Sequence, residues 1–383
     1  MRRIPTTPRA GWQARVEAAG LAWHTAERPY WNESAFYEFT AREVAVLEAA
    51  TNELEAMTLR AADYLIENRL YDRMQIPAPA APLIEASWEA EAPSAASPSL
   101  SLYGRFDLAY DGSEPPKLLE YNADTPTSLL EAAVVQWYWL QDTAPGGDQF
   151  NSLHERLIAQ WKALAPCLPE GRIDLCSMDD VEDGMTVTYL QDTAQQAGLA
   201  AGCFAIDEIG WNGSEFIGPD ERPLRAVFKL YPWEWMVREE FGRFLADART
   251  LWIEPAWKML LSNKGILPVL WQLYPGHPNL LESHFEGPGA MESWVRKPLL
   301  GREGANIFMH LPGADFETGG DYGAEGFVYQ KLARIASFDG RYPVIGSWVV
   351  GHEPGNAAAG MGIRESDTPI TTNFSQFVPH LFD

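Results

Sequence analysis

Polar side chains occupy alternate positions of two short apolar segments, and their types suggest metal and phosphate chemistry. Arg105 and Asp107 lie two residues apart in the first segment, as do Glu120 and Asn122 in the second. Residues 111–116 between them read Asp-Gly-Ser-Glu-Pro-Pro, which is typical of a turn. Because strand side chains alternate between faces, a hairpin that pairs 107 with 120 and 105 with 122 would bring all four polar groups onto one face.

Such a face could hold a magnesium ion together with phosphate. Asp107, Glu120 and Asn122 offer hard oxygen ligands, and Mg²⁺ in proteins is usually held by one or two carboxylates plus the phosphates of a substrate. Arg105 beside them could bind a phosphate oxygen and stabilise charge during transfer. The alternative is a solvated hairpin in which Arg105 pairs with Asp107, and the spacing alone leaves both interpretations open.

Two later segments carry lysines and glycines in places that suit a nucleotide. Lys264 begins an apolar run in residues 262–268, and Lys297 ends a short predicted strand. Residues 300–306, Leu-Gly-Arg-Glu-Gly-Ala-Asn, form a glycine turn whose backbone amides could close over phosphates. A solvated surface lysine and an ordinary turn explain each segment singly. Together with the acidic face, they favour a metal and phosphate site.

The composition limits the classes of protein to consider. The chain has 383 residues, of which 46% are hydrophobic and 21% charged, as in a soluble globular protein of two or three lobes. Its 29 basic and 53 acidic residues give a net charge of −24, which disfavours nucleic acids and anionic membranes as partners. The three cysteines form no C-x-x-C pair, and no apolar stretch resembles a signal or a membrane span. We therefore expect a cytoplasmic protein.

Several common catalytic motifs are absent from the sequence. It contains neither a P-loop nor a G-x-G-x-x-G fingerprint, which argues against P-loop NTPases and nicotinamide or flavin Rossmann enzymes. It also lacks H-E-x-x-H and G-x-S-x-G, the motifs of zinc proteases and of α/β-hydrolase nucleophiles.

Periodicity predicts a mixed α/β chain. One or two long amphipathic helices are expected between residues 33 and 68, followed by an Ala/Pro/Ser-rich linker at 77–98. A strand, helix and strand near 173–177, 187–196 and 201–206 form a βαβ-like unit. The remaining elements are strands at 101–110, 117–121, 294–297, 327–332 and 344–350, a buried helix at 129–140, and apolar runs at 226–230 and 266–273.

Five ordered blocks resemble the synthetase domain of the glutathionylspermidine synthase family, which belongs to the ATP-grasp superfamily. The similarity extends from about Tyr30 to the end and is closest to the stand-alone relatives described as acid–amine ligases. The blocks are Arg105 to Asp124, Asn263 to Pro268, Lys297 to Arg302, Tyr329-Gln330, and Arg364.

The resemblance implies an α+β or α/β fold of the ATP-grasp type, similar to the ATP-binding fold of glutathione synthetase. Residues 1–100 would then form an N-terminal helical region and 146–225 a pre-ATP-grasp βαβ subdomain. Residues 101–145 and 226–383 would form the lobes that hold ATP and metal.

The resemblance also implies roles for individual residues. Asp107, Glu120 and Asn122 match magnesium ligands, and Arg105 and Arg364 match the catalytic arginines. The positions matching ATP contacts are Arg105, Phe106, Asp107, Lys264, Lys297, Gly304, Gln330, Lys331, Leu332 and Ala333. The positions matching substrate contacts are Thr125, Ser128, Asp207, Glu208 and Glu234. For Thr125 and Ser128 the alternative is a cap on the following helix.

The implied activity is an ATP- and Mg²⁺-dependent carboxylate–amine ligase. The γ-phosphoryl group would pass to a carboxylate of a small molecule or peptide, and an amine would attack the resulting acyl phosphate. One alternative is an ATP-binding regulatory or structural protein of the same fold without ligase turnover. Another is a kinase that phosphorylates a small acceptor.

Overall fold

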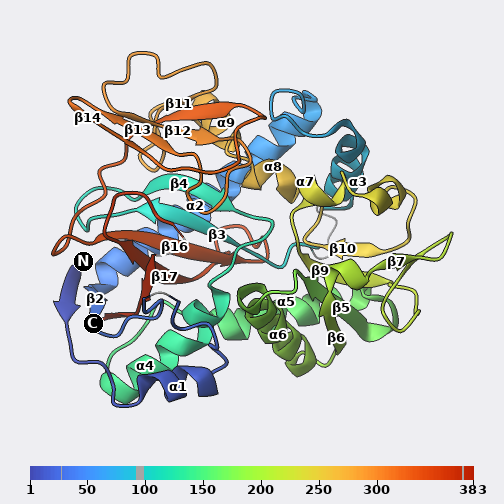
Figure 1. Ribbon diagram of the computed structural model, residues 1–383, viewed down its shortest axis with the longest axis horizontal. Coiled ribbons are helices and arrows are strands. Elements are labelled where there is room, and N and C mark those ends of the chain that lie inside the picture. Colours follow the sequence, from blue (N-terminus) through green and yellow to red (C-terminus); the bar gives the residue numbers. More distant parts are fainter. Residues whose placement is uncertain (27, 92–98, 373–374) are drawn as a thin grey trace.

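The computed structural model describes residues 1–26, 28–91, 99–372 and 375–383. These residues form a mixed α/β fold with several sheets, shown in Figure 1. The helices are α1 (Trp12–Ala18), α2 (Ala41–Glu67), α3 (Ala81–Glu91), α4 (Gln136–Thr143), α5 (Leu153–Leu164), α6 (Val181–Gln196), α7 (Trp233–Met236), α8 (Lys258–Ser262) and α9 (Ile266–Leu273). A π-helical turn, Glu131–Val135, leads into α4, and 3₁₀ turns occur at Ala78–Ala80, Ala165–Cys167, Pro169–Gly171, Ile206–Glu208 and Glu240–Phe244. No helix in the described ranges has both the length and the apolar character needed to cross a bilayer.

The central sheet contains the predicted hairpin. Its order is β18 (Gln376–Val378), β17 (Ala358–Ser366), β16 (Tyr342–Val350), β3 (Tyr103–Ala109) and β4 (Lys117–Asn122). Asp107 pairs with Glu120 and Arg105 with Asn122, so the predicted register is confirmed. A bulge follows Asp107, after which Leu108 pairs with Leu118. The four polar side chains therefore share one face of the sheet.

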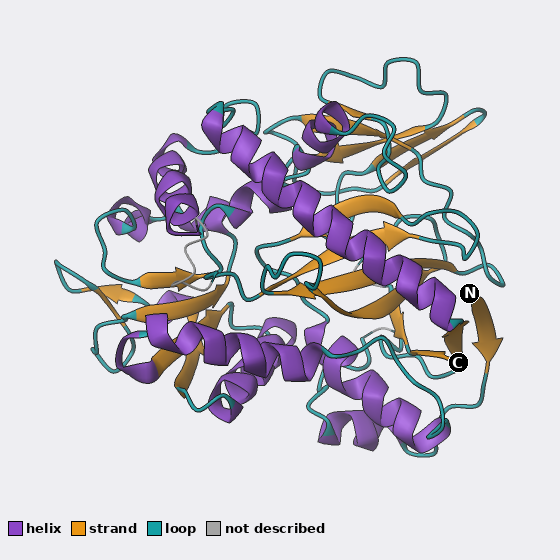
Figure 2. Ribbon diagram, turned by 180° about the vertical axis from the view of Figure 1, so that it is seen from behind, coloured by secondary structure: helices purple, strands orange, loops and turns teal. Residues whose placement is uncertain are grey.

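The opposite face of this hairpin is apolar and covered by α2. The rings of Phe106 and Tyr121 stack with centroids 3.8 Å apart, and Leu108 and Leu118 are fully buried. Figure 2 shows α2 running across this side of the central sheet. The helix begins with a capping box, in which the Thr40 hydroxyl accepts from the Glu43 amide and the Glu43 carboxylate accepts from the Thr40 amide.

A second sheet lies over the polar face of the hairpin. Its order is β11 (Ser283–His284), β15 (Phe327–Lys331), β12 (Trp294–Pro298), β13 (Phe308–Leu311) and β14 (Ala314–Glu317). All of its pairs are antiparallel. The side chains of Lys297 and Gln330 point toward the central sheet, because they donate to the Leu119 and Leu118 carbonyls of β4.

The βαβ unit belongs to a parallel sheet of order β10 (Leu251–Ile253), β9 (Ala226–Leu230), β5 (Arg172–Ser177) and β6 (Ala200–Ala205). The prediction of strand, helix and strand is confirmed, but α6 begins at Val181 rather than near 187. Asp180 caps it by accepting from the Asp183 amide. A small hairpin, β7 (Gly210–Trp211) with β8 (Phe216–Ile217), follows this unit.

Two expectations for the N-terminal region need correction. Residues 35–39 form a strand, β2 (Ala35–Phe39), which lies between β1 (Arg2–Pro5) and β19 (His380–Phe382), so the region is not purely helical. The side chains of β2 are buried at alternate positions, which explains why this segment forms a strand and not a helix. The predicted linker contains α3. This helix is held in place because Ile84 is buried and Trp88 packs against Trp257. Residues 92–98 lie outside the described part of the chain.

Candidate active site

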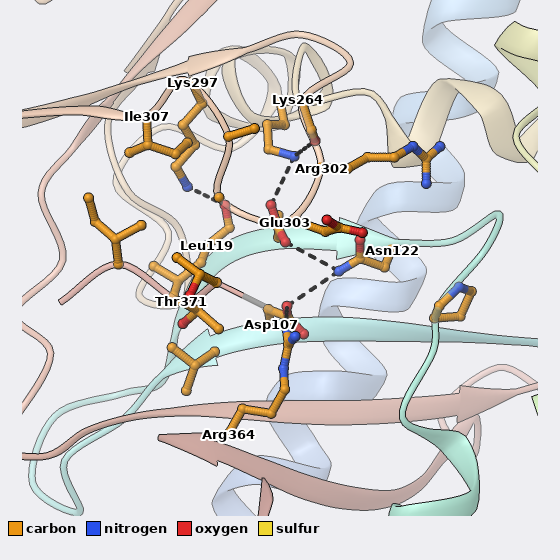
Figure 3. A pocket seen from close by; sticks show the side chains of 18 of the residues that line it. Asp107, Leu119, Asn122, Lys264, Lys297, Arg302, Glu303, Ile307, Arg364 and Thr371 are labelled. Carbon is orange, nitrogen blue, oxygen red and sulfur yellow. Dashed lines mark hydrogen bonds and ion pairs between the residues drawn. The ribbon is translucent and has the colours of Figure 1, made fainter. Parts of the chain in front are cut away.

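A cavity of about 620 Å³ lies between the hairpin, the second sheet and the first turn of α6. Figure 3 shows Lys264 and Lys297 reaching toward the hairpin from one side and Arg364 from the other. The wall carries three kinds of surface: a central group of charged residues, an apolar end, and an acidic end. Each is built by segments that are far apart in the sequence.

The centre of the cavity is the polar face of β3 and β4. Arg105 donates from Nε to Asp107 Oδ1 at 2.7 Å and from Nη2 to Oδ2 at 3.2 Å. Arg364, from β17, lies 3.3 Å from Asp107 Oδ2 through its Nη2. The Asn122 amide nitrogen reaches Asp107 at 3.3 Å and Glu120 at 3.4 Å. The three side chains predicted to bind metal therefore converge on one point.

Two lysines bring positive charge to the same point. Lys264 Nζ lies 2.9 Å from Glu120 Oε2 and donates to the Gly301 carbonyl at 2.6 Å. Lys297 Nζ donates to the Leu119 carbonyl and to Gln330 Oε1, both at 2.8 Å. The structure thus brings together residues from β3, β4, β12, β15 and β17.

The charges affect one another's protonation. Burial alone would raise the pKa of Glu120, but Lys264 and Lys297 hold that pKa well below its usual value. Burial, assisted by repulsion from Lys264 and opposed by the charge of Glu120, lowers the pKa of Lys297 to about 8. Glu120 is therefore ionised at neutral pH and available as an oxygen ligand.

This donor set fits a magnesium ion that is shared with a phosphate. Within the described residues no three His, Cys, Asp or Glu side chains cluster as a complete metal site. Two carboxylates and one amide oxygen are a partial set, which is what Mg²⁺ uses when substrate phosphates supply further ligands. The amide of Asn122 would have to present its oxygen rather than its nitrogen, a rotation that exchanges two similar atoms.

The apolar end of the cavity suits a flat ring. Gln330 is buried there beside Lys297, and Leu332 and Ala333 continue the strand along the wall. The other apolar residues of this end are Leu119, Val295, Ile307, Met309, Ile335 and Val344. Lys331 points the other way and lines a separate cavity of about 380 Å³. Phe106 also faces away, since its ring is buried against Tyr121, so its side chain is not brought to the predicted ATP site.

Substrate positions predicted from the resemblance divide into two groups. Thr125 and Glu234 meet at Arg302, whose Nη1 and Nη2 donate to them at 2.7 Å each. Ser128 does not line the cavity: its hydroxyl lies 3.0 Å from that of the buried Tyr30.

Asp207 and Glu208 are likewise not brought to the cavity. They form a turn after β6, where Glu208 accepts from the Ala205 amide at 2.9 Å. That local hydrogen bond accounts for the position of Glu208, and neither residue lines the cavity.

The acidic end was missed because the sequence placed the start of α6 too late. Asp180, Glu182 and Asp183 line the cavity from the first turn of that helix. Burial raises the pKa of Asp183 to about 7, assisted by repulsion from Asp180 and Glu182. Burial also raises the pKa of Glu182. An aspartate followed by acidic residues and an apolar run is a helix-start signal that could have identified them.

The glycine turn closes one side of the cavity. Gly301, Arg302, Glu303, Gly304 and Ala305 all line it. We call residues 301–305 the lid. Gly304 has a φ of 70°, and a Cβ there would collide with the carbonyl oxygen of Thr371. Only glycine fits this close approach between the lid and the opposite wall.

The resemblance implies ATP turnover, and replacing Gly304 with alanine is therefore expected to lower that turnover by about 10²-fold, the effect of a misplacement near 1 Å in a site whose catalysis depends on positioning. The measurement is ADP release at saturating ATP. Gly313→Ala is the matched control, because Gly313 also has a positive φ, 89°, but has open space around its Cβ position. Equal rates for Gly304→Ala and the control would contradict a closed lid.

Comparisons with known proteins agree on one family. The family model described as glutathionylspermidine synthase preATP-grasp matches residues 3–383. A Haemophilus influenzae protein provisionally named an acid–amine ligase is 45% identical over 92% of this chain and 91% of its own. A trypanothione synthetase of Crithidia fasciculata is 29% identical over 72% of this chain and 46% of its own.

Two further comparisons concern a longer relative and a solved structure. The bifunctional glutathionylspermidine synthetase/amidase of Escherichia coli is 26% identical over 84% of this chain, which spans 56% of that enzyme. A glutathione synthetase-like effector from Globodera pallida matches in structure with a TM-score of 0.56 at 9% identity, covering 97% of this chain and 96% of that one. The last match indicates a similar fold.

Proposed function

The chain belongs to the glutathionylspermidine synthase family and is a ligase, and we propose that it joins a carboxylic acid to an amine with ATP and Mg²⁺ through an acyl phosphate. The observation that carries the proposal is the meeting of Asp107, Glu120 and Asn122 with Lys264 and Lys297 over one cavity. We assign residues 101–145 and 226–383 to ATP-grasp-like lobes, and 146–225 to a pre-ATP-grasp subdomain.

ATP is placed with its base at the apolar end and its phosphates at the charged centre. The wall formed by the buried Gln330 and Ala333 and the half-buried Leu332 suits the adenine. Lys264 and Lys297 would contact phosphate oxygens. Asp107, Glu120 and Asn122 would hold Mg²⁺, which would supply positive charge to neutralise the phosphates.

The acid would lie between the γ-phosphate and the lid. A carboxylate oxygen attacks the γ-phosphorus, the bond from that phosphorus to the β–γ bridging oxygen breaks, and ADP leaves. Arg105 and Arg364 are placed to stabilise the charge on the transferring group, because both already flank Asp107. The lid excludes water, which would otherwise hydrolyse the acyl phosphate.

The amine would approach from the acidic end. Asp180, Glu182 and Asp183 favour a cationic group there, and the amine must lose a proton before its nitrogen attacks the acyl carbon. Phosphate then leaves and an amide remains. One related enzyme is named a glutathionylspermidine synthetase, for a conjugate of glutathione with spermidine. We therefore propose a peptide or small carboxylate and a cationic amine as the substrate classes.

ADP release tests the proposal. Candidate acids, beginning with glutathione, are combined with candidate amines, beginning with spermidine, and mass spectrometry identifies the product. We expect ADP release to rise only when an acid and an amine are present together, and the product to be an amide. Unchanged basal hydrolysis across the panel would favour a protein that binds ATP without ligation, and a phosphorylated acceptor would indicate a kinase.

Amine binding is expected to strengthen as the pH rises through about 7, where Asp183 becomes charged. The KM for a cationic amine should fall between pH 6 and pH 8, by about tenfold for one charge-assisted contact. Asp183→Asn should remove most of this dependence, whereas Asp192→Asn, on the exposed face of α6, should not.

The raised pKa of Asp183 also predicts how the stability of the fold depends on pH. The pKa of an aspartate in the unfolded chain is its ordinary value of 3.8, while burial raises the pKa of Asp183 in the folded protein to about 7. The folded state therefore binds more protons between these values, and stability should fall as the pH rises from 4 to 7, by at most about 1.4 kcal/mol per pH unit. Asp183→Asn should lack this decline; an identical decline in the variant would show that another group titrates.

A further inference from the structure

A buried carboxylate beyond the end of β4 ties several walls of the cavity together. Asp124 and Lys229 are both fully buried, and Lys229 Nζ donates to Asp124 Oδ1 at 2.5 Å. The Trp233 amide donates to Asp124 Oδ2 at 3.0 Å. The amides of Ala123 and Asp124 donate to the Ser262 hydroxyl at 3.0 and 2.8 Å. We call Asp124, Lys229, Trp233 and Ser262 the Asp124 hub.

Each member of the hub adjoins residues that do line the cavity. Asp124 lies two residues after Asn122, and Ser262 lies two residues before Lys264. Lys229 precedes Leu230 and Trp233 follows Pro232, and both of these neighbours line the cavity. Trp233 is also the first residue of α7, whose Glu234 does not line this cavity but contacts the lid. None of the four hub residues lines the cavity itself. The hub therefore acts on the site only through its neighbours.

The path from the hub to the lid passes through α7. Glu234 follows Trp233 directly and accepts from Arg302 Nη2 at 2.7 Å. Arg302 also donates to Thr125, the residue next to Asp124. Both hydrogen-bond partners of the Arg302 guanidinium thus come from segments that Asp124 fixes. The guanidinium ties the lid to α7 and to Thr125. The lid backbone is held separately, by Lys264 at the Gly301 carbonyl and by Thr318 at the Gly304 carbonyl.

We propose that Asp124 is a positioning residue that fixes the start of α7, so that Glu234 holds Arg302 and keeps the lid closed. The inference rests on the proposed function where it concerns the acyl phosphate, which a loosened lid would expose to water. The contact between α7 and the lid itself does not depend on the identity of either substrate.

The charge pair can be separated from the positioning role. Removing one member of a buried pair leaves an unpaired charge, but replacing both by apolar residues of similar volume is often neutral for stability. Asp124→Leu/Lys229→Met removes the pair and also the acceptor for the Trp233 amide. Asp124→Asn/Lys229→Met removes the pair but keeps an oxygen that can accept from that amide. The second double variant is the matched control for the first.

Trypsin cleavage after Arg302 reports the lid directly, in the full chain and without substrate. We expect Asp124→Leu/Lys229→Met to be cleaved there about fivefold faster than wild type, as for the loss of one hydrogen bond. Asp124→Asn/Lys229→Met should be cleaved at the wild-type rate. Cleavage after the exposed Arg249 is the internal reference and should be equal in all variants.

A double-mutant cycle tests whether the hub acts through Glu234. Glu234→Ala alone should expose Arg302, and adding Asp124→Leu/Lys229→Met should cause no further increase. The inference would be overturned if the two changes together raised the cleavage rate by the product of their separate effects. Unchanged cleavage in the leucine variant, or equal cleavage in both double variants, would also overturn it. If the leucine variant does not fold, as judged by circular dichroism, Asp124→Ala/Lys229→Met makes the same comparison, because alanine also lacks the acceptor.

The ratio of ADP released to amide formed is the functional readout. It should rise about fivefold in the leucine variant and stay near the wild-type value in the asparagine variant. A wild-type protein that forms no amide would contradict the proposed function, while the cleavage pattern would still decide the role of Asp124. A cleavage pattern as expected with an unchanged ratio would show that the hub closes the lid without protecting an intermediate, and would overturn the functional part of the inference.

Discussion

Replacing Asp107 with asparagine is expected to lower ATP turnover by about 10²–10³-fold, the usual effect of removing one preorganised electrostatic contact. The carboxylate accepts from Arg105 and Asn122 and pairs with Arg364, so it balances two arginines at the point where metal is proposed to bind. The asparagine keeps the size and one acceptor but removes the charge, so the loss should appear in kcat and in the Mg²⁺ concentration needed for half activity.

The control for Asp107 lies in the turn of the same hairpin. Asp111 accepts from the amides of Ser113 and Glu114, and asparagine can accept from them equally well. Asp111→Asn should therefore keep wild-type turnover. If Asp107→Asn also kept the wild-type rate, while both variants folded, the polar face of the hairpin would not be the site of phosphoryl transfer.

Lys264→Met is expected to cost about 10²-fold in kcat/KM for ATP, because a phosphate contact and the partner of Glu120 are lost together. Lys264 contributes to the low pKa of Glu120, so the variant should also need more Mg²⁺ at acidic pH. Lys162→Met, an exposed position at the end of α5, is the matched control. A wild-type KM for ATP in Lys264→Met would remove this lysine from the phosphate site.

The central hairpin could be predicted from sequence because its information is local. Alternation within 105–107 and 120–122 fixes which side chains share a face, and a slip of one residue would bury the charged set. Elementary patterning therefore gave the register that pairs Asp107 with Glu120. Residue type then indicated the chemistry, since carboxylate and amide oxygens are magnesium ligands.

The convergence of the lysines could not be derived from such patterns. Lys264 and Lys297 reach the hairpin from the turn before α9 and from β12. Their residue context and the family resemblance both pointed to them, but neither showed that they meet at the hairpin. Long-range pairing also decided residues 35–39, where strands from both ends of the chain override a helical periodicity.

Two physical reasons explain why some predicted side chains do not line the cavity. Phe106 and Lys331 are adjacent in sequence to residues of the site, but strand alternation turns their side chains away from the cavity. The acidic end was assigned to Asp207 and Glu208, whereas the structure brings Glu182 and Asp183 to the cavity. Nearness along the chain therefore does not predict which side chains line the cavity where strand side chains alternate between faces or where a helix begins earlier than expected.

The most direct test of the account follows oxygen from the acid to phosphate. An acid that supports turnover is labelled with ¹⁸O in its carboxylate, and the inorganic phosphate formed with the amine is analysed by mass spectrometry. Transfer of the γ-phosphoryl group to the carboxylate predicts one ¹⁸O atom in each phosphate released. Unlabelled phosphate, or label found in AMP, would contradict an acyl phosphate formed in this cavity.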